Sequence, residues 1–197
     1  MERQILGWEE WVALPLLGIP ALTAKIDTGA KTSAIHAFAI EPFGEQNSPN
    51  VRFGIHPIPD RPEVELFCSA RLVDRREITS SNGEKELRYV ISTPVRIGDM
   101  EWPIELTLTN RDTMQNRMLL GRQAITETMI VDPNQRFLQP RLSYDLYTNL
   151  KKSRPIVRPL RIGLLTREAN NYSSRRIIEA AEAKGHVCEV INTSRCY

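Results

Sequence analysis

The stretch Lys25-Ile-Asp-Thr-Gly-Ala-Lys-Thr-Ser33 decides how this chain is interpreted. Apolar residues run into Asp27, and Gly29 allows the backbone to turn back just beyond the carboxylate. A carboxylate held in such a turn is a candidate catalytic acid or base. Asp-Thr-Gly also occurs in plain turns, where the aspartate accepts hydrogen bonds from backbone N–H groups. The residues alone leave both interpretations open.

The sequence around this stretch predicts a mainly β domain. Short apolar runs recur between turn residues, and several alternate apolar and polar positions as half-buried strands do. Asn82-Gly83 predicts a hairpin, and Gly121–Thr128 predicts one short helix. Many short strands with one late helix are typical of a small barrel or sandwich. The expected strands are Ile5–Trp8, Trp11–Leu17, Leu22–Ile26, Ala34–Ile40, Val51–Ile55, Val64–Leu72, Leu87–Ile97 and Trp102–Leu108.

The last quarter of the chain predicts an α/β segment. A strand over Leu160–Thr166 is followed by a helix that starts with Ser173 as its N-cap and ends before Gly185. A second strand over His186–Asn192 completes one βαβ unit. Such a unit cannot bury both faces of a parallel sheet, so it predicts an incomplete α/β domain. The predicted division is a first domain over 1–149, a basic, proline-containing linker over 150–159, and the βαβ segment over 160–197.

Composition excludes several classes of protein. The 197 residues are 41% hydrophobic and 25% charged, as in ordinary soluble domains. There is no run of about 18 to 20 apolar residues, so no membrane association is expected. The N-terminus lacks a signal-peptide layout, which predicts a cytoplasmic protein. Three scattered cysteines argue against a disulfide framework and against a thiolate zinc site.

The net charge of +2 hides a division along the sequence. Residues 1–149 carry a net charge of −4, whereas residues 150–197 carry +6. This sign change supports two units of different origin. The basic residues are interspersed rather than dense, so no direct nucleic-acid binding is expected.

A second motif far downstream makes the first one specific. Met118-Leu-Leu-Gly-Arg-Gln-Ala-Ile125 follows the Asp-Thr-Gly-Ala loop in the order found in retropepsin-like aspartic proteases, which the chain resembles. The resemblance implies a closed acid-protease barrel and aspartic endopeptidase activity. It assigns catalysis to Asp27, Thr28 and Gly29. The residues expected to bind substrate are Ala30, Lys31, Asn82 and Gly83, and those expected to serve structure or dimer formation are Gly121 and Arg122.

Aspartic-protease chemistry requires two carboxylates. Two that lie close together cannot both ionise, so one can activate water while the other donates a proton. The chain has a single Asp-Thr-Gly, because Asp112-Thr113-Met114 lacks the glycine. A working site therefore requires a homodimer that places two copies of Asp27 face to face. The resemblance gives Thr28 the role of bracing the two loops across that interface.

Two longer resemblances cover most of the chain. Residues 6–140 resemble a bacterial family labelled ATP-dependent zinc protease, also described as a RimK/LysX-associated domain. The segment from Ile162 to Tyr197 resembles the start of RimK-type glutamate ligases, which are ATP-grasp enzymes. ATP and Mg are therefore expected only with the ligase part beyond this segment, because no glycine-rich phosphate loop is present. The further matches to the first family are Ala30–His36, Ser80–Gly83, Trp102 and Leu106–Asp112.

The resemblance to RimK-type ligases also suggests a substrate. These enzymes add glutamates to a C-terminus, including that of a ribosomal protein, so an associated peptidase would process acidic tails. Lys31 would attract such a tail toward Asp27. The alternative is a non-catalytic module that binds a tail or regulates the ligase.

The zinc label has little support in the residues. There is no His-Glu-x-x-His motif, and the chain has only His36, His56 and His186. No cofactor is therefore expected in this chain, with His36 retained as an alternative metal ligand. Ser33, Ser92 and Cys68 lack the surroundings of a nucleophile.

Overall fold

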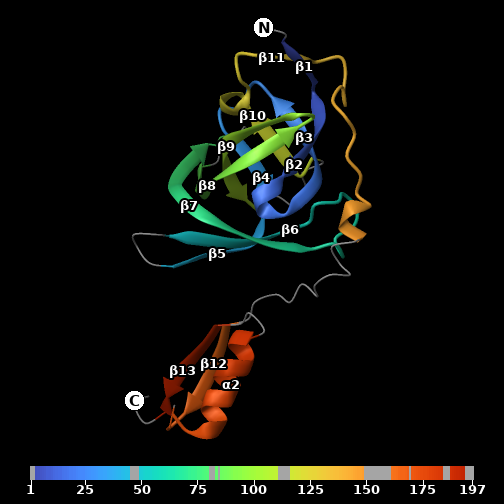
Figure 1. The fold of residues 1–197 in the computed structure, drawn as a ribbon. Coiled ribbons are helices and arrows are strands. Elements are labelled where there is room, and N and C mark those ends of the chain that lie inside the picture. Colours follow the sequence, from blue (N-terminus) through green and yellow to red (C-terminus); the bar gives the residue numbers. More distant parts are fainter. Residues whose placement is uncertain are drawn as a thin grey trace. The chain divides into compact units, whose positions relative to one another are not determined.

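The computed structural model describes residues 3–44, 49–79, 83, 85–110, 116–148, 161–168, 170–183 and 187–193. The chain forms two compact units, Met1–Arg154 and Pro155–Tyr197 (Figure 1). The linker predicted over 150–159 lies outside the described residues, and the domain boundaries stay predictions.

The first unit is built around a closed barrel of six strands, which confirms the mainly β prediction. The order around the barrel is β2-β3-β10-β4-β9-β8, and β8 closes it by pairing with β2 at Ala13 and Arg96. The strands are β2 (Glu9–Leu14), β3 (Ile19–Asp27), β4 (Ser33–His36), β8 (Lys85–Ile97), β9 (Met100–Thr109) and β10 (Met118–Gly121).

The sheet continues outward from β8 through three more strands (Figure 1). These are β7 (Leu66–Thr79), β6 (Asn50–Ile55) and β5 (Phe38–Phe43). The predicted hairpin is present, because β7 and β8 pair in antiparallel fashion out to Thr79 and Lys85. The strand predicted over Ala34–Ile40 is wrong as one element, since the structure divides it into β4 and β5. The positive φ of 46° at Ala39 accompanies a register irregularity in β5.

The helix predicted over Gly121–Thr128 is also wrong. Only a single 3-10 turn, η2 (Arg122–Ala124), forms there, and Ile125 already has the extended angles φ −87° and ψ 118°. The β-branched residues after Ala124 disfavour helix, which explains why the turn is not continued. The chain then enters β11 (Met129–Asp132), which pairs in parallel with β1 (Gln4–Gly7) as a separate small sheet. Another 3-10 turn, η1 (Pro15–Leu17), connects β2 to β3.

The barrel interior is filled by large aliphatic side chains. Each contributes about 1.5 to 3 kcal/mol by leaving water, so their sum is the main stabilisation of the unit. Members with under 2% of their surface exposed include Leu14, Ile19, Leu22, Ile35, Ile91, Leu106, Leu108 and Met118.

A buried carboxylate ties the C-terminal part of the first unit to the barrel. Glu10 is fully buried on β2 and accepts hydrogen bonds from the backbone N–H groups of Gly7, Leu138 and Gln139, at 2.7, 3.0 and 3.2 Å. The Tyr147 hydroxyl donates to the carbonyl of Ala21 on β3. These contacts hold residues 137–147 against β2 and β3 and thereby shape that side of the barrel.

The second unit confirms the predicted βαβ arrangement. Strands β12 (Arg161–Thr166) and β13 (Val187–Asn192) pair in parallel, and α2 (Tyr172–Ala183) lies between them in sequence. The predicted N-cap at Ser173 is wrong. The cap is Asn171, whose Oδ1 accepts the N–H of Ser174 at 2.7 Å. Among the described residues, no helix combines the length and apolarity needed to cross a bilayer.

Candidate active site

Asp27 stands at the end of β3, where the chain leaves the barrel wall. Its Oδ1 accepts hydrogen bonds from the N–H groups of Gly29 and Ala30, each at 3.1 Å. Its Oδ2 lies 3.5 Å from Nζ of Lys25, two residues earlier on the same side of the strand. The side chain is 25% exposed, so the loop orients the carboxylate and still leaves it open to a ligand.

Gly29 is needed for a reason that differs from the expected one. The turn was expected to require the backbone freedom of glycine, yet Gly29 does not have a positive φ. A Cβ atom there would instead lie 3.3 Å from Oδ1 of Asp27. A side chain would therefore press on the carboxylate oxygen that the loop holds.

The insertion of β10 between β3 and β4 supports the loop from behind. β10 runs parallel to β3, with Gly121 paired to Asp27, and antiparallel to β4. The approach is so close that a Cβ on Gly121 would lie 2.6 Å from the backbone of Thr32. The N–H of Gly121 donates to Oγ of Ser33 at 3.1 Å, which fixes the far end of the loop. Glycine at this position therefore allows the two motifs to meet.

Arg122 binds the loop through backbone groups. Its Nη1 donates to the carbonyl of Gly29 at 3.3 Å, and its N–H donates to the carbonyl of Ala30 at 2.8 Å. The N–H of Gln123 donates to the carbonyl of Lys31 at 3.2 Å. The 3-10 turn η2 thus holds the loop of the same chain, and a role of Arg122 in a dimer stays a prediction.

The structure brings together most of the predicted site residues. Asp27, Gly29, Ala30, Gly121 and Arg122 form one connected set. Exposed Thr28 and Lys31 lie on the same loop. Lys25 and Arg122 contribute positive charge beside the loop, which itself carries the exposed Lys31, and Glu9 on β2 pairs with Lys25 across the strands. Sequence reasoning missed Lys25 and Ser33. The two-residue period of β3 could have indicated Lys25, whereas nothing local indicates that Ser33 receives the N–H of Gly121.

The hairpin predicted to cover a substrate is only partly described. Asn82 lies outside the described residues, and Gly83 has a φ of +84° with open space around the position of a Cβ. No contact of Gly83 with the Asp27 loop is seen in the described part of the chain. The assignment of both residues to substrate binding stays a prediction.

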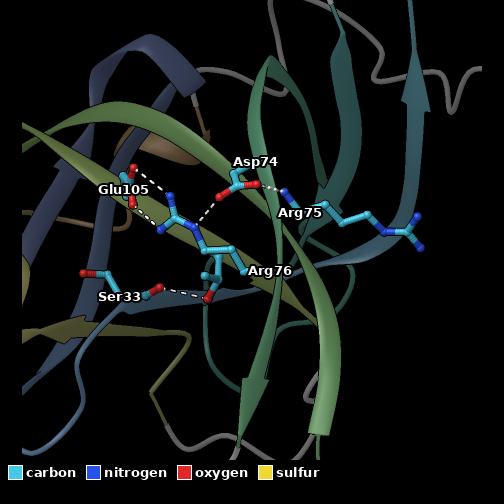
Figure 2. A network of polar contacts seen from close by, with 6 residues as sticks. Ser33, Asp74, Arg75, Arg76 and Glu105 are labelled. Atoms are coloured by element: carbon cyan, nitrogen blue, oxygen red, sulfur yellow. Dashed lines mark hydrogen bonds and ion pairs between the residues drawn. The ribbon is translucent and has the colours of Figure 1, made fainter. Parts of the chain in front are cut away.

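The outer part of the β7–β8 hairpin, from Asp74–Val90 to Thr79–Lys85, forms an arm. An ion-pair network joins this hairpin arm to β9 (Figure 2). Arg76 on β7 donates to both carboxylate oxygens of Glu105 on β9 and also to Asp74. Hydrogen bonds from Arg76 lower the pKa of Asp74 and of Glu105 below their usual values. Figure 2 places Ser33 beside this network, and its carbonyl accepts from Oγ1 of Thr107 at 2.9 Å. The ion pairs therefore tie β7 to β9, and Thr107 of β9 separately holds Ser33 at the start of β4.

The strand register places the side chains of Asp27, Lys25 and Asp74 on the same face of the sheet. Lys25 pairs with Leu119, and Leu119 pairs with Ala34 on β4. The same row then continues through Thr107 and Val90 and ends at Asp74. Since side chains alternate between faces, this row shares the face of Asp27.

Two of the three histidines and the buried cysteine fall within the described residues. His36 is 1% exposed on β4, and its ring centroid lies 6.3 Å from that of His56. Among the described residues, no three His, Cys, Asp or Glu side chains gather where a metal could bind. His186 lies outside the described residues. Burial raises the pKa of the Cys68 thiol to about 12, which disfavours a nucleophilic thiolate.

Comparison with known proteins gives two matches in sequence order. Residues 5–142 match the model of the RimB-like family, described as retropepsin-like aspartic endopeptidase RimB. Residues 160–197 match the RimK pre-ATP-grasp domain. Both resemblances drawn from the motifs are thereby confirmed. Together they associate the chain with RimK-type glutamate ligases.

Whole-chain relatives agree with this order of domains. A "Probable alpha-L-glutamate ligase" of Shewanella pealeana is 46% identical over 200 residues, which cover 98% of this chain and 42% of that protein. A protein of the same name from Parasynechococcus marenigrum is 41% identical over 202 residues, covering 100% and 43%. The chain thus spans about two fifths of the length of these curated relatives.

A solved structure shares the fold of the first unit. A Legionella pneumophila protein of unknown function has a TM-score of 0.57 and 29% sequence identity to this chain. The match covers 68% of this chain and 97% of that one.

Proposed function

Since the chain belongs to the RimB-like family of retropepsin-like aspartic endopeptidases, we propose that residues 1–149 act as one lobe of a dimeric aspartic peptidase. The observation that carries the proposal is the geometry of Asp27. Two backbone N–H groups fix one carboxylate oxygen, and a quarter of the side chain remains exposed at the loop surface. Thr28 is exposed on the same loop and, in the proposed dimer, contacts the second copy of the loop.

The proposed chemistry uses one Asp27 from each protomer. The ionised carboxylate takes a proton from water while the water oxygen attacks the peptide carbonyl carbon. The protonated carboxyl of the other protomer donates its proton to the carbonyl oxygen. Collapse of the resulting tetrahedral species breaks the C–N bond. The amine nitrogen takes the proton that the first carboxylate had accepted, and one hydroxyl on the carbon returns its proton to the second carboxylate, which restores both groups. No metal is needed for any of these steps.

The charge around Asp27 supports acidic peptides as the substrate class. Lys25 and Arg122 contact the loop, which itself carries the exposed Lys31, and a cationic surface raises the local concentration of anionic chains. The association with RimK-type ligases points in the same direction, because those enzymes produce glutamate tails. We therefore propose glutamate-rich C-terminal tails, including that of a ribosomal protein, as substrates of a cytoplasmic enzyme.

Asp27→Asn tests the catalytic assignment. The substitution keeps the size of the side chain and removes the acid–base group, so cleavage of a poly-glutamylated peptide should fall at least about a thousandfold. Mass spectrometry of the products measures the rate. Asp99→Asn, in the turn between β8 and β9, is the matched control and should cleave at the original rate. Undiminished cleavage by Asp27→Asn would sink the proposal.

Mixing the two forms tests the dimer. If each site needs two copies of Asp27, an equal amount of Asp27→Asn should capture half of the active protomers and reduce cleavage to about half. The chains must exchange partners before the assay. An unchanged rate after full exchange, or a strictly monomeric active protein, would contradict the shared site.

The alternative is a binding or regulatory module of a RimK-type ligase. The observation that favours it is the ion pair of Asp27 with Lys25, which also suits a structural turn. Within the described residues no second carboxylate contacts Asp27. A module of this kind would bind the acidic peptide without cleaving it, and Asp27→Asn would leave that binding intact. A zinc peptidase, the third candidate, would lose activity with a chelator and regain it with zinc.

A further inference from the structure

A separate pocket lies on the outer side of β2 and β3, under the C-terminal segment of the first unit. Its volume is about 300 Å³. Its walls include Trp8, Trp11 and Tyr144, with Glu9, Thr23 and Arg136 among its polar residues. The size is at the lower end of small-molecule sites and suits a single side chain or a small amine.

This pocket is next to the Asp27 site, because Glu9 in its wall pairs across the strands with Lys25, the ion-pair partner of Asp27. Trp11 pairs with Thr23 and Glu9 pairs with Lys25 across β2 and β3. Thr23 precedes Asp27 by four residues on the same face, a separation of about 13 Å along an extended strand. The pocket and the carboxylate loop therefore share a face of the barrel but have different lining residues.

The walls of the pocket are aromatic. The rings of Trp11 and Tyr144 meet edge to face with centroids 4.9 Å apart, and the Tyr144 side chain is hydrogen-bonded to Thr23. Trp8 is 37% exposed at the opening. Aromatic faces carry negative potential and attract cations. The guanidinium of Arg141 makes such a cation–π contact, 5.8 Å from the ring centroid of Trp11.

Glu9 supplies a largely buried carboxylate whose ion pair with Arg136 is long. Its side chain is 11% exposed, and its Oε2 lies 3.8 Å from Nη1 of Arg136. Arg136 itself is 62% exposed and extends over the ring of Phe137 at 5.6 Å. Burial raises the pKa of the Glu9 carboxyl although Arg136 acts in the opposite direction. A cation inside the pocket would compensate the buried charge better than this distant guanidinium does.

We propose that this pocket binds a primary ammonium group on an aliphatic stem, such as a lysine side chain, with Glu9 as its counter-ion. The stem lies against Trp8 and Tyr144, and the ammonium reaches the carboxylate. Binding here does not depend on peptidase activity. A partner with an exposed lysine, or a free alkylamine, satisfies the same chemistry.

NMR titration with n-butylammonium tests the proposal on the full chain. The indole N–H signals of Trp8 and Trp11 should shift and saturate at millimolar probe. The signal of Trp102 is an internal control and should not move, because its indole N–H donates to the carbonyl of Ala124 elsewhere in the barrel. n-Butanol and butyrate, which lack the positive charge, should bind at least tenfold more weakly.

Two variants of the pocket give opposite expectations. Glu9→Gln should weaken n-butylammonium at least tenfold, whereas Glu101→Gln, which removes an exposed carboxylate on β9, should not change its affinity. Arg136→Gln removes the competing cation and should strengthen binding severalfold, so the proposal remains testable if Glu9→Gln does not fold. Asp27→Asn should still give saturable shifts at Trp8 and Trp11, which separates this proposal from the peptidase.

Three results would overturn the proposal. The first is the absence of saturable shifts at Trp8 and Trp11. The second is equal or tighter binding of butyrate, which would make Arg136 the recognition group for an anion. The third is unchanged affinity for n-butylammonium in a folded Glu9→Gln variant.

Discussion

The barrel unit and the βαβ unit place similar aliphatic side chains in very different surroundings. In the barrel, Leu106 and Ile91 are fully buried because the sheet closes on itself. In the βαβ unit, Leu165 is 66% exposed, and Ile177, Val187 and Ile191 are each more than 40% exposed. A closed sheet covers its own apolar face, whereas two parallel strands with one helix leave most of theirs uncovered. The barrel is thus stabilised by side chains that it buries itself. The βαβ unit requires further protein to cover its apolar side chains.

Hydrogen exchange should show the largest consequence of this difference. We expect amides in β8 and β9 to exchange at least about a thousandfold more slowly than those in β12 and β13, because only the former must await opening of a buried core. Mass spectrometry or NMR of the full chain measures both sets in one sample. Comparable protection in the two units would contradict the proposed difference in how well their apolar side chains are covered.

Matched leucine truncations should give the next largest effect. Leu106→Ala should cost the barrel about 3 kcal/mol, since it leaves a cavity in a packed interior. Urea unfolding followed by tryptophan fluorescence reports this change, as all three tryptophans lie in the first unit. Leu165→Ala should change the protection of β12 by less than about 0.5 kcal/mol. A large loss at Leu165 would indicate that its side chain is covered in solution.

Within the barrel unit, the hairpin arm differs from the buried core because exposed ion pairs help to hold it. Arg76→Met should cost less than about 1 kcal/mol at neutral pH, since the partners are substantially exposed. The pKa values of Asp74 and Glu105 are lowered, so their contribution is present above the ordinary values of 3.8 and 4.5. It is lost as the pH falls below those values toward the folded pKa.

Urea unfolding between pH 3 and 7 measures this dependence. The stability difference between the original protein and Arg76→Met should shrink below about pH 4. Arg96→Met, which removes one exposed ion pair with Glu101, is the control for losing an arginine from a strand. A difference that stays constant across this range would remove the ion pairs as its cause.

Local patterns account for the parts of the fold that sequence could predict. Alternating residues gave most strands, and Asn82-Gly83 gave the β7–β8 hairpin. The Asp27 loop was recognisable because its aspartate, threonine and glycine are consecutive. These features depend on neighbouring residues, which a single sequence displays directly.

The features that sequence could not predict depend on distant pairings. Neither the position of β10 between β3 and β4 nor the bond from Gly121 to Ser33 leaves a local signal. The short β11 escaped notice because it is held by β1 from the other end of the unit. The helix expected after Gly121 failed because barrel pairing and β-branched residues outweighed a weak local preference. The aromatic pocket likewise required segments that are far apart in sequence.

The insertion of β10 has a consequence for the order of events during protein synthesis. β3 and β4 emerge early from the ribosome, but the strand between them comes more than 80 residues later. β3 can pair with β2 as soon as it is made, but until β10 arrives neither β3 nor β4 has that neighbour, and closing so long a loop is slow. The support that Gly121 and Arg122 give to the Asp27 loop is therefore absent until residues 118–122 have been made. A nascent chain interrupted before that point would contain the motif without an assembled site.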